Sequence, residues 1–257
     1  MPFAPLVDPV EDLPADERVR TARHRVMFDF GDAAQRRLAA AHVAVVGAGG
    51  LGSAVILALA AAGVGTLTVI DDDDVDLSNL QRQVLHRRGD VGAPKVDSAV
   101  RAAADLSATR VIARRARLDT RNAADLLAGA HVIVDGSDTF DTRRAVAAAS
   151  ESTGLPLVWG TVQEFAGQAT VFWSRPSAGT PIVLDDLYPA ASVGTLPSCA
   201  EVGVFGPLCL QIGAVLATET VKLVTGVGEP LLGRVLLVDA LRGTQREVPL
   251  RPARVSA

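Results

Sequence analysis

Cysteine is scarce in this sequence, with only Cys199 and Cys209 among 257 residues. Two cysteines cannot form the disulfide framework of a small secreted domain, so we expect a reduced, cytoplasmic protein. They also cannot supply the four thiolates of a tetrathiolate zinc site, so we expect no structural zinc.

Basic charge and long apolar runs are scarce as well. The formal net charge of -4 and the pI of about 5.6 argue against a nucleic-acid-binding surface, despite one short basic run at Arg114–Arg117.

The N-terminus has no basic region followed by an apolar core, so we expect no signal peptide. The longest apolar helix candidates are Ser53–Ala62, which is too short to cross a bilayer, and Val204–Val224, which carries Glu219 and Lys222. We therefore expect no membrane partner.

Short apolar runs alternate with helical patterns through the first two thirds of the chain. A β-branched run, a glycine turn, a helix and a second strand within about thirty residues indicate a βαβ unit. The expected strands are His42–Val46, Thr66–Ile70, Arg110–Leu118, His131–Asp135 and Pro156–Gly160. The expected helices are Ala33–Ala40, Ser53–Ala62, Lys95–Leu106, Arg121–Leu127 and Phe140–Thr153.

The pattern changes after Trp159. We expect a strand at Gly167–Trp173, a long loop at Arg175–Pro197, a helix at Val204–Val224, and strands at Arg234–Val238 and Glu247–Leu250. Residues 1–19 are rich in Pro, Asp and Glu, which predicts a flexible N-terminal arm. Residues 20–257 are expected to form one α/β domain with a Rossmann-like, mostly parallel sheet flanked by helices, a long crossover loop and C-terminal strands.

A glycine-rich turn follows the first strand and opens a helix. Its glycines, Gly47, Gly49, Gly50 and Gly52, let backbone N–H groups approach phosphates at a helix N-terminus. The plainer interpretation is a tight strand–helix turn, but the context favours nucleotide binding. Asp71 lies about twenty residues further on, at the end of the second strand, where a carboxylate can accept both ribose hydroxyls. This much fits NAD as well as ATP.

The stretch that follows Asp71 favours ATP. Asn79, Arg82 and Lys95 could converge on a triphosphate, where preorganised cations stabilise the charge that grows on phosphoryl oxygens. Taken singly, Asn79 would be a helix cap and the two cations ordinary surface charges. An NAD-dependent oxidoreductase remains the alternative enzyme, although this cluster has no role in one. A nucleotide-binding scaffold without catalysis would be expected to have lost Arg82, Lys95 or Asp138, and all three are present.

Several motifs together resemble the MoeB/ThiF family, the bacterial relatives of ubiquitin-activating enzymes. They are Gly47–Gly52, Asp71, the string Ser78-Asn79-Leu80-Gln81-Arg82-Gln83, Gly92-Ala93-Pro94-Lys95, and Ser198–Pro207 before a long helix. The resemblance runs from about Arg20 to Leu250. It is strongest to the MoeZ-type members, without the C-terminal rhodanese domain of those proteins.

The resemblance implies an ATP- and Mg²⁺-dependent adenylyltransferase. Its substrate would be the C-terminal Gly-Gly carboxylate of a ubiquitin-fold sulfur-carrier protein, activated for thiocarboxylate formation in molybdopterin, thiamine or related biosynthesis. A separate sulfur donor, a rhodanese or a cysteine desulfurase, is then expected, together with a homodimeric assembly. A family member that adenylates a peptide or acts on tRNA is the alternative, because the sequence does not reveal the surface that selects the substrate.

The family's roles transfer to matching positions. The glycine turn and the string Ser78, Asn79, Leu80, Gln81 and Arg82 would bind the nucleotide, with Lys95 on the phosphates and Asp71 on the ribose. Asp138 would hold magnesium, which favours carboxylate oxygen. Its plainer role is the N-cap of the helix Phe140–Thr153.

Three further positions bear on the resemblance. Arg23, in Arg20-Thr21-Ala22-Arg23-His24, would be the arginine contributed across a dimer interface, although Thr21 replaces the family's tyrosine. Thr139 stands where the family has an asparagine beside the adenosine. Cys199 would be a covalent relay for the activated carboxyl or for sulfur. Its alternative is a small packed residue, which is also what we expect of Cys209, inside the helix pattern.

Overall fold

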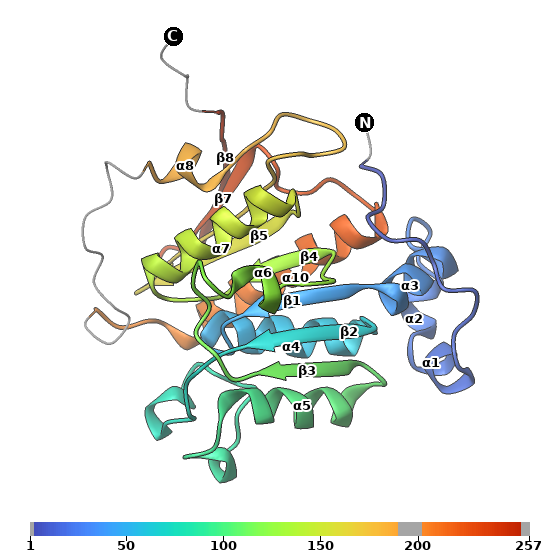
Figure 1. Ribbon diagram of the computed structural model, residues 1–257, viewed down its shortest axis with the longest axis horizontal. Coiled ribbons are helices and arrows are strands. Elements are labelled where there is room, and N and C mark those ends of the chain that lie inside the picture. The colour runs from blue at the N-terminus through green and yellow to red at the C-terminus, as the bar shows by residue number, and fades with distance from the viewer. Residues whose placement is uncertain (1–2, 190–201, 253–257) are drawn as a thin grey trace.

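The computed structural model describes residues 3–189 and 202–252. Within these residues the chain forms an eight-stranded sheet in the order β3-β2-β1-β4-β5-β6-β7-β8 (Figure 1). The strands are β1 (His42–Val46), β2 (Thr66–Ile70), β3 (Arg110–Arg114), β4 (Val132–Asp135), β5 (Leu157–Gln163), β6 (Ala166–Phe172), β7 (Arg234–Asp239) and β8 (Thr244–Pro249). Strands β3, β2, β1, β4 and β5 are parallel neighbours, and β6 to β8 continue the sheet antiparallel. The expected mostly parallel α/β architecture is confirmed.

Helices cover both faces of this sheet (Figure 1). Helices α3 (Gly31–Ala40), α4 (Gly50–Ala62), α5 (Lys95–Leu106) and α10 (Gly206–Thr225) share one hydrophobic cluster, and α6 (Ala123–Leu126) and α7 (Phe140–Thr153) share the other. The short helices are α1 (Ala15–Arg20), α2 (Ala22–Arg25) and α8 (Leu184–Leu187), with 3-10 turns at Leu77–Asn79 and Arg88–Asp90. This is the three-layer arrangement expected for crossover connections between parallel strands.

Strand β1 shows how the sequence sets these layers. Successive side chains of a strand point to opposite faces. Val43 and Val45 therefore pack in the cluster beneath α4 and α10, whereas Ala44 and Val46 pack in the cluster beneath α7. All four are 3% exposed or less, as expected for a central parallel strand buried on both faces.

Most differences from the expected elements are shifts of one to four residues, but β3 is four residues shorter than predicted. Its last residue, Arg114, pairs with Ile70, the last residue of β2. Beyond that point residues 115–118 have no neighbouring strand, so they leave the sheet, and residues 116–118 form part of a pocket wall. A segment with a strand pattern forms a strand only as far as a neighbouring strand pairs with it.

The N-terminal arm is not the loose segment that its composition predicts. Val7 and Leu13 are buried, the amide of Leu6 donates to the Leu223 carbonyl, and the ring of Phe3 stacks at 6.1 Å on Trp173. Phe3, Leu6 and Val7 pack in or against the main hydrophobic cluster, so the burial of apolar surface outweighs the polar composition of the arm.

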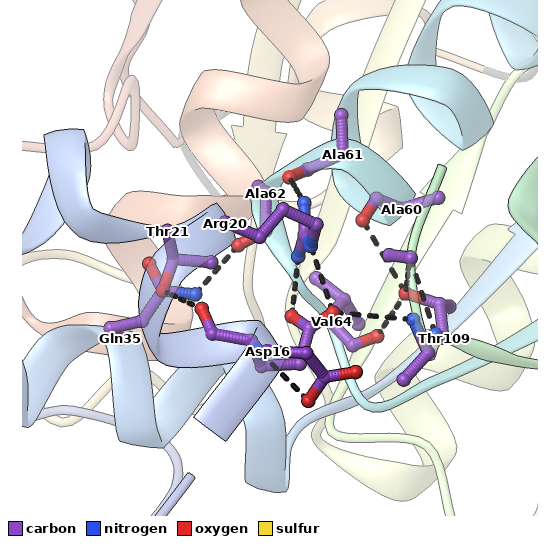
Figure 2. A network of polar contacts seen from close by, with 12 residues as sticks. Asp16, Arg20, Thr21, Gln35, Ala60, Ala61, Ala62, Val64 and Thr109 are labelled. Carbon is purple, nitrogen blue, oxygen red and sulfur yellow. Dashed lines mark hydrogen bonds and ion pairs between the residues drawn. The ribbon is translucent and has the colours of Figure 1, made fainter. Parts of the chain in front are cut away.

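A polar network fastens α1 and α3 to the C-terminal end of α4 (Figure 2). The guanidinium of Arg20 donates to the Ala61 carbonyl, and the Gln35 amide donates to the Ala62 carbonyl at 2.7 Å. Such contacts satisfy carbonyls that the last turn of a helix leaves without intrahelical partners. The chain then turns away through Gly63 in the left-handed region, with φ of 89°.

Helix α10 is long and apolar enough to cross a membrane by length and composition, but 61% of its most apolar window is buried inside the fold. It packs along α4 and across β5 and β6. Glu219 lies buried in it, where one carboxylate oxygen accepts from the Leu231 amide and the other from Lys222, both at 2.6 Å. We interpret α10 as a core helix.

Candidate functional site

A pocket opens where the parallel strands β1, β2 and β4 end, at the point where the strand order reverses. Such a crevice is the usual ligand site of an open α/β sheet. The glycine turn, the aspartate run, the loop after β4 and the first turns of α7 surround it. Its lining includes Gly47, Gly49, Gly50, Asp71, Asp72, Asp73, Arg82, Gln83, Lys95, Ala116, Arg117, Leu118, Ser137, Asp138, Thr139, Thr142, Arg143, Val162, Val204 and Cys209.

The glycine turn needs its glycines for close packing. Gly47 has φ of 89°, and a Cβ there would lie 2.9 Å from the Gly136 carbonyl oxygen, in the loop after β4. A Cβ at Gly52 would lie 1.8 Å from the Gly47 carbonyl oxygen. Gly52 therefore lies behind the turn and contributes packing rather than pocket surface. The N-terminus of α4, which begins at Gly50, faces the pocket and favours an anion there.

Asp71 joins the end of β2 to the glycine turn. One carboxylate oxygen accepts from the Ala48 amide at 2.7 Å, and the other accepts from the Asp73 amide at 2.9 Å. Burial raises the pKa of the Asp71 carboxyl, and the Lys95 ammonium opposes that rise. The side chain is thus held in one orientation at the pocket wall.

The aspartates after Asp71 are each paired with a cation. Asp72 lies 3.0 Å from Arg117, Asp74 lies 2.8 Å from Arg115, and Asp73 lies 2.7 Å from the Nζ of Lys95. The first two pairs are exposed and contribute little stability. The side chain of Lys95 is only 7% exposed, so its ammonium is held at the pocket by Asp73. The carboxylates of Asp71, Asp72 and Asp73 also lie within 4.8 Å of one another.

Only the end of the string 78–83 reaches the pocket. The turn Leu77–Asn79 is capped by Asp76, whose carboxylate accepts from the Ser78 amide, while the Asn79 side-chain oxygen accepts from the Asp76 amide at 3.1 Å. This is the capping role expected for Asn79 as its plainer alternative. The turn brings Arg82 to the pocket, with its Nη1 donating to the Ser78 carbonyl at 3.2 Å.

The loop after β4 carries Asp138. Asp135 ends the strand fully buried and accepts from the Ser137 amide at 2.9 Å; burial raises its pKa, and the Arg143 guanidinium opposes the rise. Thr139, not Asp138, caps α7, because its hydroxyl accepts from the Thr142 amide. Asp138 is exposed at the pocket and makes no ion pair within the described residues, so its oxygens suit a hard cation such as Mg²⁺.

The pocket therefore gathers most of the predicted nucleotide-binding residues. Among the described residues, it brings together Gly47, Gly49, Gly50, Asp71, Arg82, Lys95, Asp138 and Thr139, and it does not include Gly52, Ser78, Asn79, Leu80, Gln81 or Arg23. Arg23 is exposed on α2, which packs against α3 far from the glycine turn. Cys199 lies outside the described residues. Cys209 is buried in α10, as predicted, and lies behind Gly50, where an added Cβ would be 2.9 Å from its Sγ.

Sequence reasoning missed Gln83 and Arg143. Gln83 belongs to the string 78–83 but carries no predicted role, although it is 4% exposed and lines the pocket. Arg143 shares the buried face of α7 with Val146 and Ser150, three and seven residues later. An arginine on the apolar face of a helix was the signal that could have revealed it.

Comparisons with known proteins agree on one family. A sequence model of the ThiF family matches residues 21–256. A probable adenylyltransferase/sulfurtransferase, MoeZ, of Mycobacterium tuberculosis is 45% identical over 96% of this chain, which spans only 64% of that protein. The sulfur carrier protein adenylyltransferase of Thermus thermophilus is 41% identical, with coverage of 92% and 88% respectively. The molybdopterin-synthase adenylyltransferase of Salmonella typhimurium is 37% identical, with coverage of 93% and 95%.

Solved structures share the fold at lower identity. E. coli MccB with ATP superposes with a TM-score of 0.77 at 20% identity, over 95% of this chain and 75% of that one. PaaA superposes with a TM-score of 0.76 at 24% identity, over 93% and 75%. These likenesses establish the architecture of the sheet and helices alone.

Proposed function

The chain belongs to the ThiF family, and on that premise we propose that it is an adenylyltransferase acting on a ubiquitin-fold sulfur-carrier protein. The names of the relatives from Thermus thermophilus and Salmonella typhimurium support both the activity and the class of substrate. The observation that carries the proposal is the convergence of Asp71, Arg82 and Lys95 with the glycine turn around one pocket.

ATP would lie across the carboxyl ends of the strands. The ribose hydroxyls would donate to Asp71, and the phosphates would accept from the amides at the N-terminus of α4 and from Arg82 and Lys95. Asp138 would hold Mg²⁺, which neutralises charge on the phosphate oxygens when it is bound.

In the reaction, a carboxylate oxygen of the terminal glycine attacks the α-phosphorus of ATP. The bond from that phosphorus to the bridging oxygen breaks, and pyrophosphate leaves with the electron pair. The product is an acyl-adenylate. Arg82 and Lys95 stabilise the negative charge that accumulates on the leaving pyrophosphate.

The second step would form a thiocarboxylate. The terminal sulfur of a persulfide on a separate donor, a rhodanese or a cysteine desulfurase, attacks the acyl carbon, and AMP leaves. A thiol then attacks the donor-side sulfur of the resulting acyl disulfide, which releases the thiocarboxylate and leaves a disulfide between that thiol and the donor. Cys199 is the residue we propose as the relay for this transfer. A cytoplasmic location is proposed from the low cysteine content.

We also propose a homodimer in which Arg23 completes the partner's site. Arg23 lies near the C-terminal end of α4, whereas the glycine turn lies at its N-terminal end, about 18 Å away along the helix. Three apolar side chains within five residues of Arg23 are exposed, with Val19 at 78%, Val26 at 76% and Phe28 at 101%. Such a group is typical of an interaction surface.

The experiment that tests the proposal is ATP–pyrophosphate exchange with a panel of Gly-Gly-ended ubiquitin-fold carriers. Exchange should require a carrier, and a carrier truncated by its last two glycines should not support it.

Nucleotide choice is tested by thermal melts. ATP with Mg²⁺ should raise the Tm, and NAD should not. Tight binding of NAD without binding of ATP would instead support the oxidoreductase alternative.

A further inference from the structure

Arg143 is a buried cation on the wall of the pocket, on the side away from the ribose aspartate. It is 8% exposed and extends from the first turns of α7 toward β5. Its Nε and Nη2 donate to the Ser137 carbonyl at 3.2 and 2.9 Å, and Nη2 also donates to the Thr161 hydroxyl at 3.0 Å. The guanidinium carbon lies 5.5 Å from the centroid of the Trp159 ring. These contacts fix one edge of the guanidinium in place.

The hydrogen-bond partners of this cation are neutral. Within residues 3–189 and 202–252, no carboxylate oxygen lies within 4.0 Å of the Arg143 guanidinium, and its Nη1 makes no hydrogen bond. The next residue, Arg144, shows the contrast, because it is 32% exposed and still pairs with Asp185 at 2.9 Å. A buried charge normally requires a counter-charge. The buried Asp135 carboxyl interacts electrostatically with Arg143 but does not contact the guanidinium, so the Nη1 edge is still open to an anionic ligand.

The order of the strands suggests which ligand this is. Asp71 follows β2, the glycine turn follows β1, and Asp138 follows β4, so the nucleotide lies over these three strands. Arg143 contacts Thr161 in β5, one strand further on, where Val162 and Val204 also line the pocket. This is the side from which a second substrate can reach the α-phosphate without crossing the nucleotide.

The chemistry favours a carboxylate over a further phosphate. In an in-line displacement the attacking oxygen lies opposite the leaving pyrophosphate. Arg82 and Lys95 lie on the side of the glycine turn and the aspartate run, where the pyrophosphate leaves. A cation on the opposite side of Asp138 is placed for the nucleophile.

We propose that Arg143 binds the C-terminal carboxylate of the protein substrate through its Nη1 edge and orients it toward the α-phosphate. This assignment rests on the proposed function, and it names the residue that recognises the free carboxylate of the substrate. Its other edge braces the Ser137 carbonyl, so the same side chain links the attacking group to the loop that carries Asp138. A substrate with a blocked C-terminus loses this contact.

The test compares two forms of one carrier, with a terminal glycine carboxylate or a terminal glycinamide. The carrier is the one that gives the fastest exchange in the panel, and affinities are measured by calorimetry with a non-hydrolysable ATP analogue bound. The wild type should bind the carboxylate form roughly ten- to a hundredfold more tightly than the amide form. Arg143→Gln should bind both forms about equally, and Arg143→Lys should recover part of the preference.

Arg144→Gln is the matched control, because it removes a neighbouring arginine whose partner is Asp185. It should keep the wild-type preference and bind the ATP analogue alone as the wild type does. If Arg143→Gln keeps the wild-type preference, or the wild type has none, Arg143 only braces Ser137 and the proposal is overturned. Absence of exchange with every carrier is a different result, which overturns the proposed function and this assignment with it.

Discussion

The ammonium of Lys95 lies 2.7 Å from a carboxylate oxygen of Asp73, at the edge of the pocket that should receive a triphosphate. The lysine is nearly buried, whereas the side chain of Asp73 is 57% exposed. We therefore propose that Asp73 and a phosphate oxygen of ATP compete for this ammonium. The ion pair keeps Lys95 in place while the pocket is empty and competes with the substrate when it arrives.

Removing this competitor should tighten nucleotide binding. We expect Asp73→Asn to raise the affinity for ATP, and Lys95→Met to lower it by roughly tenfold or more, since a charge-assisted contact is lost. Calorimetry measures both. Asp74→Asn is the control, because Asp74 pairs with Arg115 instead. Weaker ATP binding by Asp73→Asn would mean that Asp73 contributes to holding the bound Mg²⁺–nucleotide.

Asp138 and Thr139 should separate catalysis from helix stability. Asp138→Ala should abolish ATP–pyrophosphate exchange while the free energy of unfolding stays near that of the wild type. Thr139→Ala should cost about 1 kcal/mol, because Thr139 is the residue that caps α7. Denaturant unfolding and exchange assays measure the two effects, with Asp141→Ala as the control. Near-normal exchange by folded Asp138→Ala would refute the magnesium role.

Mixed assemblies should show whether Arg23 acts on the partner subunit. Arg23→Ala and Asp138→Ala should each be inactive alone, and mixing them should restore part of the exchange activity. One site of each mixed dimer then has both groups intact. Mixing Lys95→Met with Asp138→Ala should restore nothing, because those residues line the same pocket. No recovery in the first mixture, despite demonstrated subunit exchange, would place Arg23 outside the partner's site.

The ionised side chain of Asp71 should lower the free energy of unfolding by an amount that depends on pH. Burial raises its pKa in the folded protein above the ordinary value of 3.8, so the ionised form is penalised by folding. That penalty is absent at pH values below 3.8 and grows as the pH rises through the folded-state pKa. The Tm of Asp71→Asn minus that of the wild type should therefore increase toward neutral pH.

The amide introduced by Asp71→Asn accepts fewer backbone hydrogen bonds than the carboxylate, but that loss shifts the Tm difference by an amount independent of pH. Paired thermal melts across the pH range separate the two effects. A Tm difference that is flat, or that falls as the pH rises, would contradict the assignment. The same variant should bind ATP more weakly, because the ribose loses its carboxylate.

Cys199 should matter only after adenylation, which needs no thiol. We expect Cys199→Ser to keep ATP–pyrophosphate exchange and to slow the formation of thiocarboxylate, followed by mass spectrometry of the carrier. A wild-type rate with a supplied sulfur donor would show that Cys199 is not the relay.

The sequence by itself determined the elements and the family. Helices Lys95–Leu106 and Phe140–Thr153 and strand Thr66–Ile70 have the predicted bounds, because hydrophobic periodicity and flanking glycines act locally. The glycine turn, Asp71 and the string 78–83 predict a nucleotide site, because these residues are adjacent in the chain or one βαβ unit apart.

Tertiary structure decided what depends on neighbouring strands and on packing. Strand β3 ends at Arg114 because β2 ends beside it, and the arm packs against a hydrophobic cluster that other elements form. Asn79 caps a turn, and Thr139 rather than Asp138 caps α7, because backbone direction selects which side chain reaches the amides. The helical spacing of Arg143 with the buried residues of α7 is a local signal, but only the packing of α7 on the sheet brings the guanidinium to Thr161 and the pocket.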